Sequence, residues 1–443
     1  MSDIISAVST AMGVGGVAII RVSGKGSIDI AKQMFYPLKK ITKFEPNVMY
    51  AGEIDGGDFR DFGMCVAFYG PHSFTGEDTI EFHCHGGTAI TQGILRKTFS
   101  LGARPATNGE FTKRAFVNGK LSLSSAEGLI DMINSESRAE VKAGYYLYRE
   151  KLTNRILALQ NGLTEALAEI DANIDYPEEG LEEMATDKLK SVIDQTVSEL
   201  ESLKGSYLCG RKIKNGVKVA LVGKPNTGKS SLLNALLAYD KAIVTAVAGT
   251  TRDIVEGQIE INGIKFFLSD TAGIRESQDL VEKIGIERTK RAVDESDLVV
   301  FVFDGSAPLD QEDRQILNSV KDKPLLKVCN KSDLGLVVNA DEYDILISAK
   351  SGNCETLKQK LFVLGGGEQV SAEADLLTEE RHYNAILNAL SCILKAQNAI
   401  GISPLDLIAY DVKECWNYLG EITGETASES IIDEIFKKFC VGK

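Results

Sequence analysis

The sequence predicts a multidomain α/β protein with an N-terminal α+β module, a helical domain, and an α/β domain inserted into the helical domain. Residues 1–118 are dominated by strand-like alternation, whereas apolar residues recur at helical spacing over 119–213 and again over 368–443. Between those helical stretches, residues 214–367 alternate buried-strand runs with helical patterns. A chain of 443 residues has room for two to three domains of ordinary size.

The N-terminal module contains three strand-like runs, over residues 17–22, 64–69 and 79–85. One face of the last run is polar and titratable, because apolar and polar residues alternate along it. Such a face suits either a pocket wall or a solvent-facing surface. The apolar members are Ile80, Phe82 and Cys84, and the polar members are Glu81, His83 and His85. The run His83-Cys84-His85 favours a structural role over a metal site, because the chain has four histidines and no second ligand cluster.

The helical domain is expected to begin at a capping box formed by Ser124 and Glu127. One long amphipathic helix follows over residues 152–170, where apolar residues are spaced by three or four. A second amphipathic helix is expected over residues 189–203 and should end near Gly205. The helical stretches on either side of the α/β domain are expected to pack together.

A phosphate-binding loop opens the inserted α/β domain. Residues 218–222 are typical of a buried parallel strand, and the pattern GKPNTGKS follows at 223–230. Its glycines let backbone N–H groups turn toward phosphate, and the next helix points its positive end at the anion. Lys229 is expected to reach the terminal phosphates as a catalytic residue, and Ser230 to bind magnesium. The predicted nucleotide contacts in this loop are Asn226, Thr227, Gly228, Lys229, Ser230 and Ser231.

Three further motifs predict that the nucleotide is a guanine nucleotide. DTAG at 270–273 follows a strand reached through an Asn262-Gly263 hairpin turn, and its aspartate is placed to hold magnesium through water. In NKSD at 330–333, the Asp333 carboxylate matches the two hydrogen-bond donors of guanine, and SAK at 348–350 supports the base. The inserted domain is therefore expected to be a P-loop GTPase domain of the Ras-like type. The predicted contacts are Asp270, Thr271, Ala272, Gly273, Asn330, Lys331, Asp333, Ser348, Ala349 and Lys350.

The segment GTTRD at 249–253 is expected to be the mobile switch that senses the γ-phosphate. Within it, Thr251 is the better placed magnesium ligand and is assigned a catalytic role. DTAG is followed by Ile274, which cannot orient water as the glutamine of Ras-type enzymes does. Glu282, a short way downstream, is the candidate for orienting the water, although an exposed glutamate at a helix start would look the same in the sequence.

Four further segments are characteristic of one protein family. They are GGVAIIRVSG at 15–24, SFTGEDTIE at 73–81 with HGG after it, GEFTKRAFVNGKL at 109–121, and the terminal FCVGK at 439–443. With these segments the chain resembles, over essentially its whole length, the MnmE (TrmE) family of tRNA-modification GTPases. The CxGK ending is highly specific, because a generic GTPase has no reason to end this way. The family's ATPxGxGG near the start reads STAMGVGG here, at 9–16, and losing the proline loosens that loop.

The resemblance implies a folate site in the N-terminal module, which would be similar to folate-binding domains and would form a homodimer contact. The cofactor would be a tetrahydrofolate derivative that donates one carbon, either 5-formyl- or 5,10-methylene-tetrahydrofolate. The family positions that contact folate fall on Arg21, Glu81, Lys120 and Lys443.

The resemblance also implies potassium-dependent hydrolysis of GTP, with face-to-face dimerisation of the GTPase domains. Asn226 matches the potassium-coordinating position, and the other ligands would be Thr245, Val247 and Thr250, mostly through backbone carbonyls. A cation there would neutralise the negative charge that develops on the phosphates. An arginine finger has this role in other GTPases, where it accelerates hydrolysis by about 10³–10⁵-fold. Glu282 matches the water-orienting glutamate. The predicted nucleotide contacts in this switch are Thr245, Ala246, Val247, Ala248, Gly249, Thr250 and Thr251.

The resemblance further implies a partner, the FAD- and NADH-using protein MnmG (GidA). Together they would add an aminomethyl or carboxymethylaminomethyl group at C5 of the wobble uridine in tRNA. Cys440 matches the family's terminal cysteine, and both a nucleophile toward uridine and a buried or redox-sensitive thiol fit that position. The alternative is a ribosome-assembly or other RNA-associated GTPase switch of the Era or Der kind, but those proteins carry a KH-like RNA-binding module after the GTPase domain.

The composition is that of a soluble cytoplasmic protein. A formal net charge of −14 argues against binding nucleic acid by bulk electrostatics, so any RNA contact has to be local or delivered by a partner. The basic residues Lys204, Arg211, Lys212 and Lys214 are interpreted as a solvated linker. The N-terminus has no secretory signal pattern, no apolar stretch approaches the roughly 20 residues that span a bilayer, and the eight cysteines lack CxxC spacing.

Overall fold

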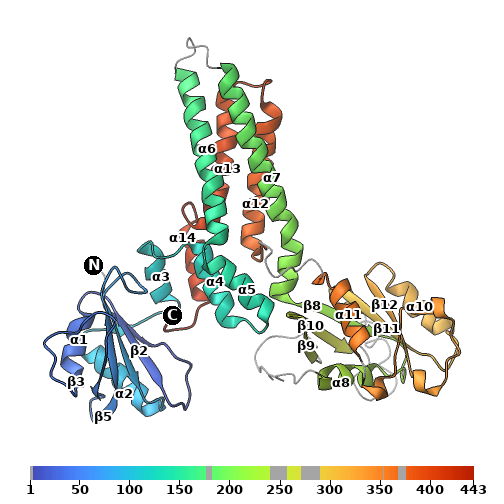
Figure 1. The fold of residues 1–443 in the computed structure, drawn as a ribbon, viewed down its shortest axis with the longest axis horizontal. Coiled ribbons are helices and arrows are strands. Elements are labelled where there is room, and N and C mark those ends of the chain that lie inside the picture. Colours follow the sequence, from blue (N-terminus) through green and yellow to red (C-terminus); the bar gives the residue numbers. More distant parts are fainter. Residues whose placement is uncertain (1–2, 176–181, 240–256, 271–289, 353, 368–375) are drawn as a thin grey trace. The chain divides into compact units, whose positions relative to one another are not determined.

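The structure is a computed structural model that describes residues 3–175, 182–239, 257–270, 290–352, 354–367 and 376–443. The chain, drawn as a ribbon in Figure 1, divides by its internal packing into two compact units. The first unit comprises residues 1–133, 144–194 and 391–443, and the second comprises residues 134–143 and 195–390. The predicted fold class is confirmed: an α+β module comes first, and an α/β domain interrupts a series of long helices. The predicted domain limits at 118, 213 and 367 stay a prediction.

The N-terminal module is built on a seven-stranded sheet of order β3-β4-β5-β6-β2-β1-β7, antiparallel except for the pair β1–β7. Helices α1 (Ser27–Met34) and α2 (Thr88–Ser100) pack their apolar side chains on one face of the sheet. The strands are β1 (Ile5–Val8), β2 (Ala18–Ser23), β3 (Phe35–Pro37), β4 (Met49–Asp55), β5 (Arg60–Phe68), β6 (Thr79–Cys84) and β7 (Arg104–Pro105).

The predicted alternation along β6 is confirmed. Ile80 and Phe82 are fully buried in the core beneath α1 and α2, whereas Glu81 and His83 lie on the opposite face. Arg21 of β2 is directly opposite Glu81 in the strand register, so it lies on that same polar face. The face of the sheet opposite α1 and α2 therefore carries a row of titratable side chains.

The C-terminal segment packs against the N-terminal module. Phe436 and Phe439 at the end of α14 (Glu429–Lys437) form a cluster with residues of the helices α3 (Glu110–Val117) and α4 (Leu123–Asn134). Val441 bridges to Asn108, and Gly442 has a φ of 97°. A Cβ at Gly442 would lie 2.1 Å from the carbonyl oxygen of Val8, so only glycine fits there. This close approach explains why the terminal motif contains a glycine.

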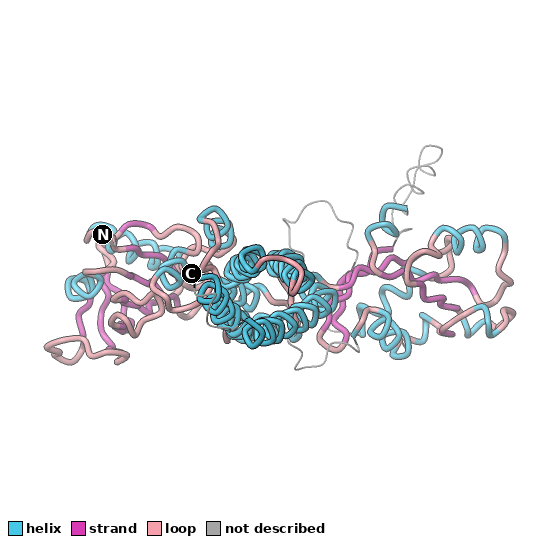
Figure 2. The backbone as a smooth tube through the Cα atoms, turned by 90° about the horizontal axis from the view of Figure 1, so that it is seen from above, coloured by secondary structure: helices cyan, strands magenta, loops and turns pink. Residues whose placement is uncertain are grey.

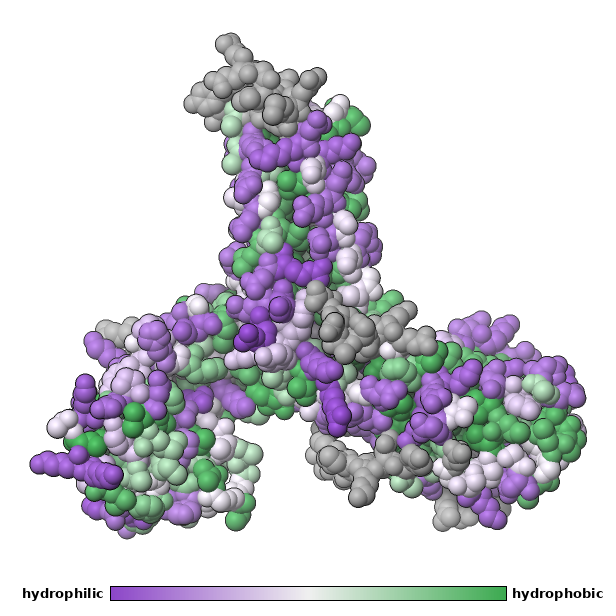
Figure 3. Space-filling view, in the orientation of Figure 1, coloured by the Kyte–Doolittle hydropathy of each residue, from purple (hydrophilic) through white to green (hydrophobic). Residues whose placement is uncertain are grey.

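Long helices form the rest of the helical part. Helix α13 packs along α6, and Trp416 of α13 donates from Nε1 to Thr164 Oγ1 of α6 at 3.1 Å. The face of the long helices seen in Figure 3 is mostly hydrophilic, with hydrophobic side chains between them. Among the described helices, none is both long enough and apolar enough to span a bilayer. The helices are α5 (Arg138–Tyr148), α6 (Lys151–Asp175), α7 (Glu182–Asn215), α12 (Glu380–Ala399) and α13 (Leu405–Thr423).

Two predicted helix boundaries are wrong. Helix α4 begins at Leu123, and Ser122 rather than Ser124 caps it, because Ser122 Oγ accepts from the Ser125 N–H at 3.1 Å. Ser124 is instead buried, with its Oγ 2.8 Å from Thr153 Oγ1.

Helix α7 continues ten residues past Gly205 and ends at Asn215, just before Gly216 with its positive φ of 71°. The predicted basic linker is therefore a helix. In it Lys204 pairs with Glu201 at 3.0 Å and Lys214 pairs with Glu379.

The α/β domain contains a six-stranded sheet of order β13-β12-β11-β8-β10-β9, parallel except for the edge strand β9. Helices lie on both of its faces (Figure 2). The Asn262-Gly263 hairpin is confirmed between β9 and β10, with φ values of 50° and 90°. The strands are β8 (Val217–Val222), β9 (Gly257–Ile261), β10 (Ile264–Asp270), β11 (Leu298–Asp304), β12 (Leu325–Asn330) and β13 (Ile345–Leu346).

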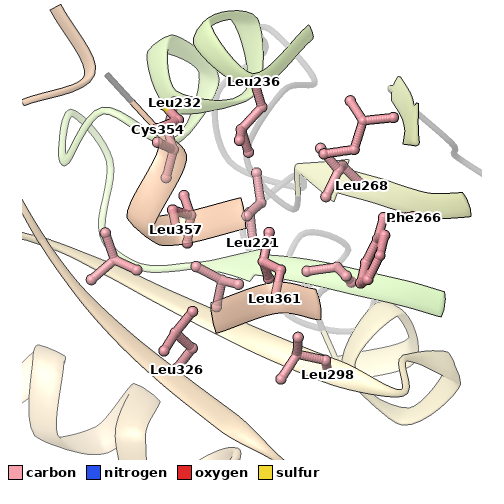
Figure 4. Close-up of a cluster of buried hydrophobic side chains, with 14 of the residues drawn as sticks. Leu221, Leu232, Leu236, Phe266, Leu268, Leu298, Leu326, Cys354, Leu357 and Leu361 are labelled. Carbon is pink, nitrogen blue, oxygen red and sulfur yellow. The ribbon is translucent and has the colours of Figure 1, made fainter. Parts of the chain in front are cut away.

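One face of this sheet packs on α8 (Lys229–Tyr239) and α11 (Glu355–Leu364). Leu232 and Leu236 of α8 and Leu357 and Leu361 of α11 meet Leu221 and the other apolar residues of the strands (Figure 4). The opposite face packs on α10 (Gln311–Ser319). Because the strands are buried on both faces, they are continuous apolar runs, as the sequence shows for β8 and β11.

Candidate functional site

The carboxyl ends of four parallel strands of the six-stranded sheet carry the predicted nucleotide motifs. Strand β8 leads into the phosphate loop, β10 ends at Asp270, β12 ends at Asn330, and β13 leads to Ser348. Ligands of open α/β sheets bind at this edge. Gly228 in the loop has a φ of 94°, and a Cβ there would lie 2.2 Å from Asn330 Nδ2, so the loop requires glycine at this position.

Lys229 is the buried cation of the phosphate loop. Its side-chain Nζ donates to the carbonyl oxygens of Gly223 at 2.7 Å and Lys224 at 2.8 Å. The residue is 4% exposed, and this burial lowers the pKa of Lys229 below its ordinary value. The loop thus holds the ammonium group at its centre by its own backbone, where an anion can replace the carbonyls as its partner.

The two predicted magnesium-binding positions in the described part of the chain are in contact. Ser230 Oγ, in the first turn of α8, donates to Asp270 Oδ2 at 2.7 Å. Asp270 is buried at 4% exposure at the end of β10. A hydroxyl and a carboxylate oxygen are hard ligands of the kind that Mg²⁺ prefers, so this pair fits a magnesium ion between them.

Asn330 joins the phosphate loop to the loop after β13. Its Nδ2 donates to the Thr227 carbonyl at 2.9 Å, and its Oδ1 accepts from the Ala349 N–H at 2.9 Å. The orientation of this buried amide is fixed, because its nitrogen donates one hydrogen bond and its oxygen accepts the other. Asp333 Oδ1 accepts from Ser348 Oγ at 2.6 Å, and this hydrogen bond lowers the pKa of Asp333. Asp333 is therefore an ionised acceptor aimed by the SAK loop.

Sequence reasoning did not identify Asp304, which orients Lys331, another predicted nucleotide contact. Lys331 has a φ of 62°, and its Nζ lies 2.6 Å from Asp304 Oδ2 at the end of β11. Burial would raise the pKa of Asp304, but hydrogen bonds from Lys331 and Ser306 lower it below its usual value. The available signal was an aspartate directly after a buried strand, at the edge where the other motifs meet.

A second ion pair outside the predicted set fixes the outside of the phosphate loop. Lys224 Nζ lies 2.7 Å from Asp310 Oδ2 and 2.8 Å from Asp313 Oδ2, at the start of α10. Hydrogen bonds from Lys224 lower the pKa of Asp310 to about 2. The two lysines of the loop therefore face different ways: Lys229 inward and Lys224 toward α10.

Three further predicted nucleotide contacts lie in the described part of the chain and are exposed: Asn226, Ser231 and Lys350. Asn226 has a φ of 62°, in the left-handed region that asparagine tolerates well. The remaining predicted switch residues lie outside the described residues. They are Thr245, Ala246, Val247, Ala248, Gly249, Thr250, Thr251, Thr271, Ala272, Gly273 and Glu282. Ile274 also lies outside the described residues.

The predicted folate residues Arg21 and Glu81 form an ion pair on the polar face of the N-terminal sheet. Arg21 Nε donates to Glu81 Oε1 at 2.8 Å, and its guanidinium lies 5.4 Å from the Phe74 ring and 5.6 Å from the Phe111 ring. His83 Nε2 is 3.5 Å from Glu81 Oε2. Burial opposes ionisation of Glu81, yet His83 and Arg21 lower its pKa. The two predicted folate residues are thus a partly buried ion pair with aromatic neighbours.

The other folate candidates and the terminal thiol lie against loops and strands of the same module. Lys120 Nζ donates to the Pro71 carbonyl at 3.0 Å, in the loop that carries Phe74. Lys443 follows Gly442, whose close contact with Val8 puts the chain end beside β1. Cys440 is exposed, so the interpretation of it as a buried thiol is wrong, whereas its roles as a nucleophile or redox-sensitive thiol stay predictions.

The residues His83, Cys84 and His85 do not converge on one point. His83 faces Glu81, and His85 Nδ1 lies 2.6 Å from Asp61 Oδ1. Cys84 is buried on the opposite face, and burial raises its pKa to about 11. Over the described ranges, no group of three or more His, Cys, Asp or Glu side chains is arranged to hold a metal ion.

Comparisons with known proteins match the whole chain. A family model described as the GTP-binding protein TrmE N-terminus matches residues 4–120, and one described as the MnmE helical domain matches residues 123–440. A tRNA modification GTPase MnmE of Natranaerobius thermophilus is 40% identical over 455 residues, which cover 100% of this chain and 99% of that protein. One of Acetivibrio thermocellus is 42% identical, again over 100% of this chain and 99% of that protein. The chain therefore belongs to the MnmE family of tRNA modification GTPases.

Proposed function

We propose that this chain is a magnesium- and potassium-dependent GTPase that works with an MnmG (GidA) partner to modify C5 of the wobble uridine in tRNA. A tetrahydrofolate derivative bound by the N-terminal module supplies the one-carbon unit. The observation that carries the GTPase part is the convergence of Lys229, Ser230, Asp270, Asn330 and Asp333 at one edge of a parallel sheet.

Each residue at that edge has a separate task in the proposed reaction. Asp333 accepts the two guanine donors, while Lys331 is held over the base position by Asp304. Lys229 binds the terminal phosphates and stabilises the charge that grows on them as water attacks the γ-phosphate in line. Ser230 and Asp270 would hold Mg²⁺, which supplies charge neutralisation at the β- and γ-phosphates. Glu282 is proposed to orient the water and Thr251 to complete the magnesium shell.

Asn226 supports a potassium site beside the phosphates. Its side chain is exposed in the phosphate loop, so its amide oxygen is available to a cation, with Thr245, Val247 and Thr250 as the other proposed ligands. GTP turnover is expected to be faster in potassium than in sodium, by about 10-fold or more, because a cation in this place does the work of an arginine finger. The measurement is GTP turnover in the two chloride salts at equal ionic strength.

An Asn226→Gly variant provides the control for the potassium experiment. Glycine adopts the φ of 62° without strain, so the variant removes the amide oxygen and leaves the loop backbone unchanged. We expect this variant to bind GDP like the wild type but to hydrolyse GTP at similar, slow rates in both salts. Equal turnover of the wild-type chain in potassium and sodium would contradict the potassium site.

The polar face of the N-terminal sheet supports the folate site. A pterin ring offers adjacent N–H donors, as guanine does, and the ionised Glu81 can accept them while the partly exposed Phe74 contacts the ring. His83 Nε2 lies 3.5 Å from Glu81 Oε2, longer than an ordinary hydrogen bond, so a ligand can take the place of Glu81 as its partner. Arg21, Lys120 and Lys443 supply positive charge for the carboxylates of a folate tail.

Exposed apolar side chains on the same sheet support a homodimer formed through the N-terminal module. Phe62 and Met64 on β5 are 56% and 45% exposed, and Met49 on the neighbouring β4 is 49% exposed. Large apolar side chains gathered on adjacent strands are typical of surfaces that a partner covers. A second copy of the chain is the proposed partner.

The folate and GTP sites are expected to be separable by mutation. Arg21→Ala and Cys440→Ser should lose wobble-uridine modification yet keep GTP turnover within about threefold of wild type, because the two sites share no residue. Arg21→Ala should also weaken 5-formyl-tetrahydrofolate binding by about 10-fold or more, since it removes a cation from an anionic cofactor. The measurements are tRNA nucleoside profiles from gene-deleted cells that express each variant, folate binding, and GTP turnover.

Arg96→Ala is the matched control, because Arg96 is an exposed arginine on α2, on the opposite face of the sheet. It should leave all three readouts unchanged. Full modification with Cys440→Ser would make the thiol dispensable, and unchanged folate binding with Arg21→Ala would remove Arg21 from the site. If the wild-type chain failed to restore C5-modified wobble uridine, the proposed function itself would be wrong.

The alternative, a ribosome-assembly switch of the Era or Der kind, has less support. The matches to the TrmE N-terminus and MnmE helical domain cover both flanks of the GTPase domain. The N-terminal ion pair and the glycine-dependent chain end have no evident use in a protein that only switches on ribosomal RNA.

A further inference from the structure

One face of helix α5 (Arg138–Tyr148) is basic and aromatic. The exposed residues of α5, with the residue that follows it, are spaced by three, four or one, so they form one continuous stripe along the helix. Together they carry three positive charges, two phenol rings and one small apolar group, and no negative charge. They are Arg138, Val141, Lys142, Tyr145, Tyr148 and Arg149, and they are called the α5 outer face below.

The acidic residues of this segment have partners within the fold, and Glu140 is buried. Glu140 is 8% exposed and lies 2.8 Å from Lys265 Nζ on β10, and Glu136 lies 3.4 Å from the same ammonium group. Glu150 Oε1 accepts from the Ser122 N–H at 3.3 Å. These carboxylates are therefore paired with groups of the fold and leave the cations on the exposed side of α5 without acidic neighbours on the same face.

The cations of the outer face have no carboxylate partner. Within the described residues, none of Arg138, Lys142 and Arg149 forms an ion pair, although the chain as a whole carries a net charge of −14. A stripe that keeps three unpaired cations is therefore suited to an external anion.

The two tyrosines make this face different from a plain basic patch. Tyr145 is 50% exposed and Tyr148 is 38% exposed, and the Arg149 guanidinium lies 6.0 Å from the Tyr145 ring centroid. Exposed rings beside arginines are the platform on which unpaired bases stack, and cations at their sides bind the phosphates. A membrane surface fits less well, because the face lacks the Trp, Phe or Leu side chains that insert into lipid.

We propose that the α5 outer face binds an unpaired, single-stranded segment of RNA. The proposal rests on the proposed function, since tRNA is the substrate there, and it adds the surface by which the substrate is contacted. Eleven helical residues span about 16 Å at 1.5 Å per residue, which is long enough for a few nucleotides. The bases stack on Tyr145 and Tyr148, and Arg138, Lys142 and Arg149 bind the backbone. RNA binding is local in this way, despite the acidic chain.

The test uses the full chain and two fluorescent RNAs: a stem–loop with an unpaired, uridine-rich loop, and the blunt duplex of the same stem. Anisotropy is measured over a salt series. The charge-reversal variant Arg138→Glu/Lys142→Glu should bind the stem–loop at least about 10-fold more weakly. The slope of the logarithm of its affinity against the logarithm of the salt concentration should be smaller by about two. The variant Tyr145→Ala/Tyr148→Ala should lose about 5-fold or more in affinity for the stem–loop for each base that no longer stacks. It should bind the duplex with the same affinity as the wild type.

Two controls match these variants elsewhere on the chain. Arg314→Glu/Lys321→Glu reverses two exposed cations on and after α10, and Tyr410→Ala removes a tyrosine that is 64% exposed on α13. Both controls should bind the stem–loop like the wild type. GTP turnover and the unfolding temperature, measured on every preparation, should be unchanged in the α5 variants, which shows that the chain is folded and the nucleotide site intact.

The outcomes separate this inference from the proposed function. If the wild type binds the stem–loop and the α5 variants bind it equally well, the α5 outer face is not the RNA surface, and the proposed function stands. If the charge reversal weakens binding but the tyrosine variant does not, the face is a non-specific anion site and stacking is wrong. A wild-type chain that hydrolyses GTP but binds no RNA overturns the inference, whereas one that does neither overturns the proposed function.

Discussion

An Asp333→Asn variant is expected to exchange its preference for GTP for a preference for xanthosine triphosphate. The Asp333 carboxylate accepts two donors of guanine, and an amide in its place puts an N–H group opposite one of them. GTP affinity should fall by roughly 10²–10⁴-fold, because a polar binding site discriminates strongly against a ring that leaves its hydrogen-bonding groups unpaired. Xanthine carries an oxygen where guanine has its amine, so the new amide donor finds an acceptor there. The measurement is competition between the two triphosphates, both in binding and in turnover.

Ser348→Ala is the matched control for this reversal. Ser348 Oγ donates to Asp333 Oδ1 at 2.6 Å, so its loss loosens the carboxylate without changing which groups it recognises. We expect Ser348→Ala to weaken GTP binding modestly and to gain nothing for xanthosine triphosphate. An Asp333→Asn variant that still prefers GTP over xanthosine triphosphate would exclude Asp333 from the base site.

The nucleotide motifs could be recognised in the sequence because each follows an apolar strand at the same edge of the sheet. Their mutual bonds could not be predicted, because these depend on which strands are neighbours. Asn330 was predicted to contact the nucleotide, and in the structure its amide connects Thr227 to Ala349. It braces the phosphate loop against the SAK loop. A change at Asn330 would therefore disturb the phosphate and base halves of the site together.

Ion pairs between distant residues are the second feature that the sequence does not reveal. Lys331 and Asp304 are separated by 27 residues, and Lys224 and Asp310 by 86. Spacing rules for helices and hairpins do not reach that far. In contrast, the polar face of β6 follows from alternation alone, and Glu81 was assigned to it correctly.

The position of the end of α7 shows how tertiary packing overrides a local signal. Gly205 is a helix breaker by propensity, at a cost of about 1 kcal/mol, but the structure puts no atom within 4 Å of where its Cβ would be. The helix continues because later residues are buried, such as Tyr207, whose ring stacks on Tyr383 at 4.0 Å between centroids. Gly210 is different: a Cβ there would lie 2.1 Å from the Leu377 carbonyl oxygen, so this glycine permits a close approach.

A Lys229→Met variant is expected to lose GTP turnover by about 10²–10³-fold or more, because it removes a preorganised donor from the charge that develops on the phosphates. Methionine fills nearly the same buried volume, so the fold should remain intact and the unfolding temperature close to wild type. GDP and GTP affinities should both fall, since the ammonium group is expected to contact phosphates of either nucleotide. The measurements are nucleotide binding by fluorescence, turnover under saturating GTP, and thermal unfolding.

Lys224→Met provides the control, because it removes an equal charge from the same loop. Lys224 Nζ is directed to Asp310 and Asp313 on α10, whereas Lys229 Nζ is enclosed by the loop carbonyls. If the direction of the ammonium group decides its role, Lys224→Met should bind nucleotide within about 10-fold of wild type. It should nevertheless lower the unfolding temperature, because the buried Asp313 carboxylate loses its cation. Equal damage from the two substitutions would mean that the loop needs only net positive charge, and near-normal turnover of Lys229→Met would exclude this lysine from catalysis. A split between the two lysines would tie catalysis to the inward-facing ammonium group alone.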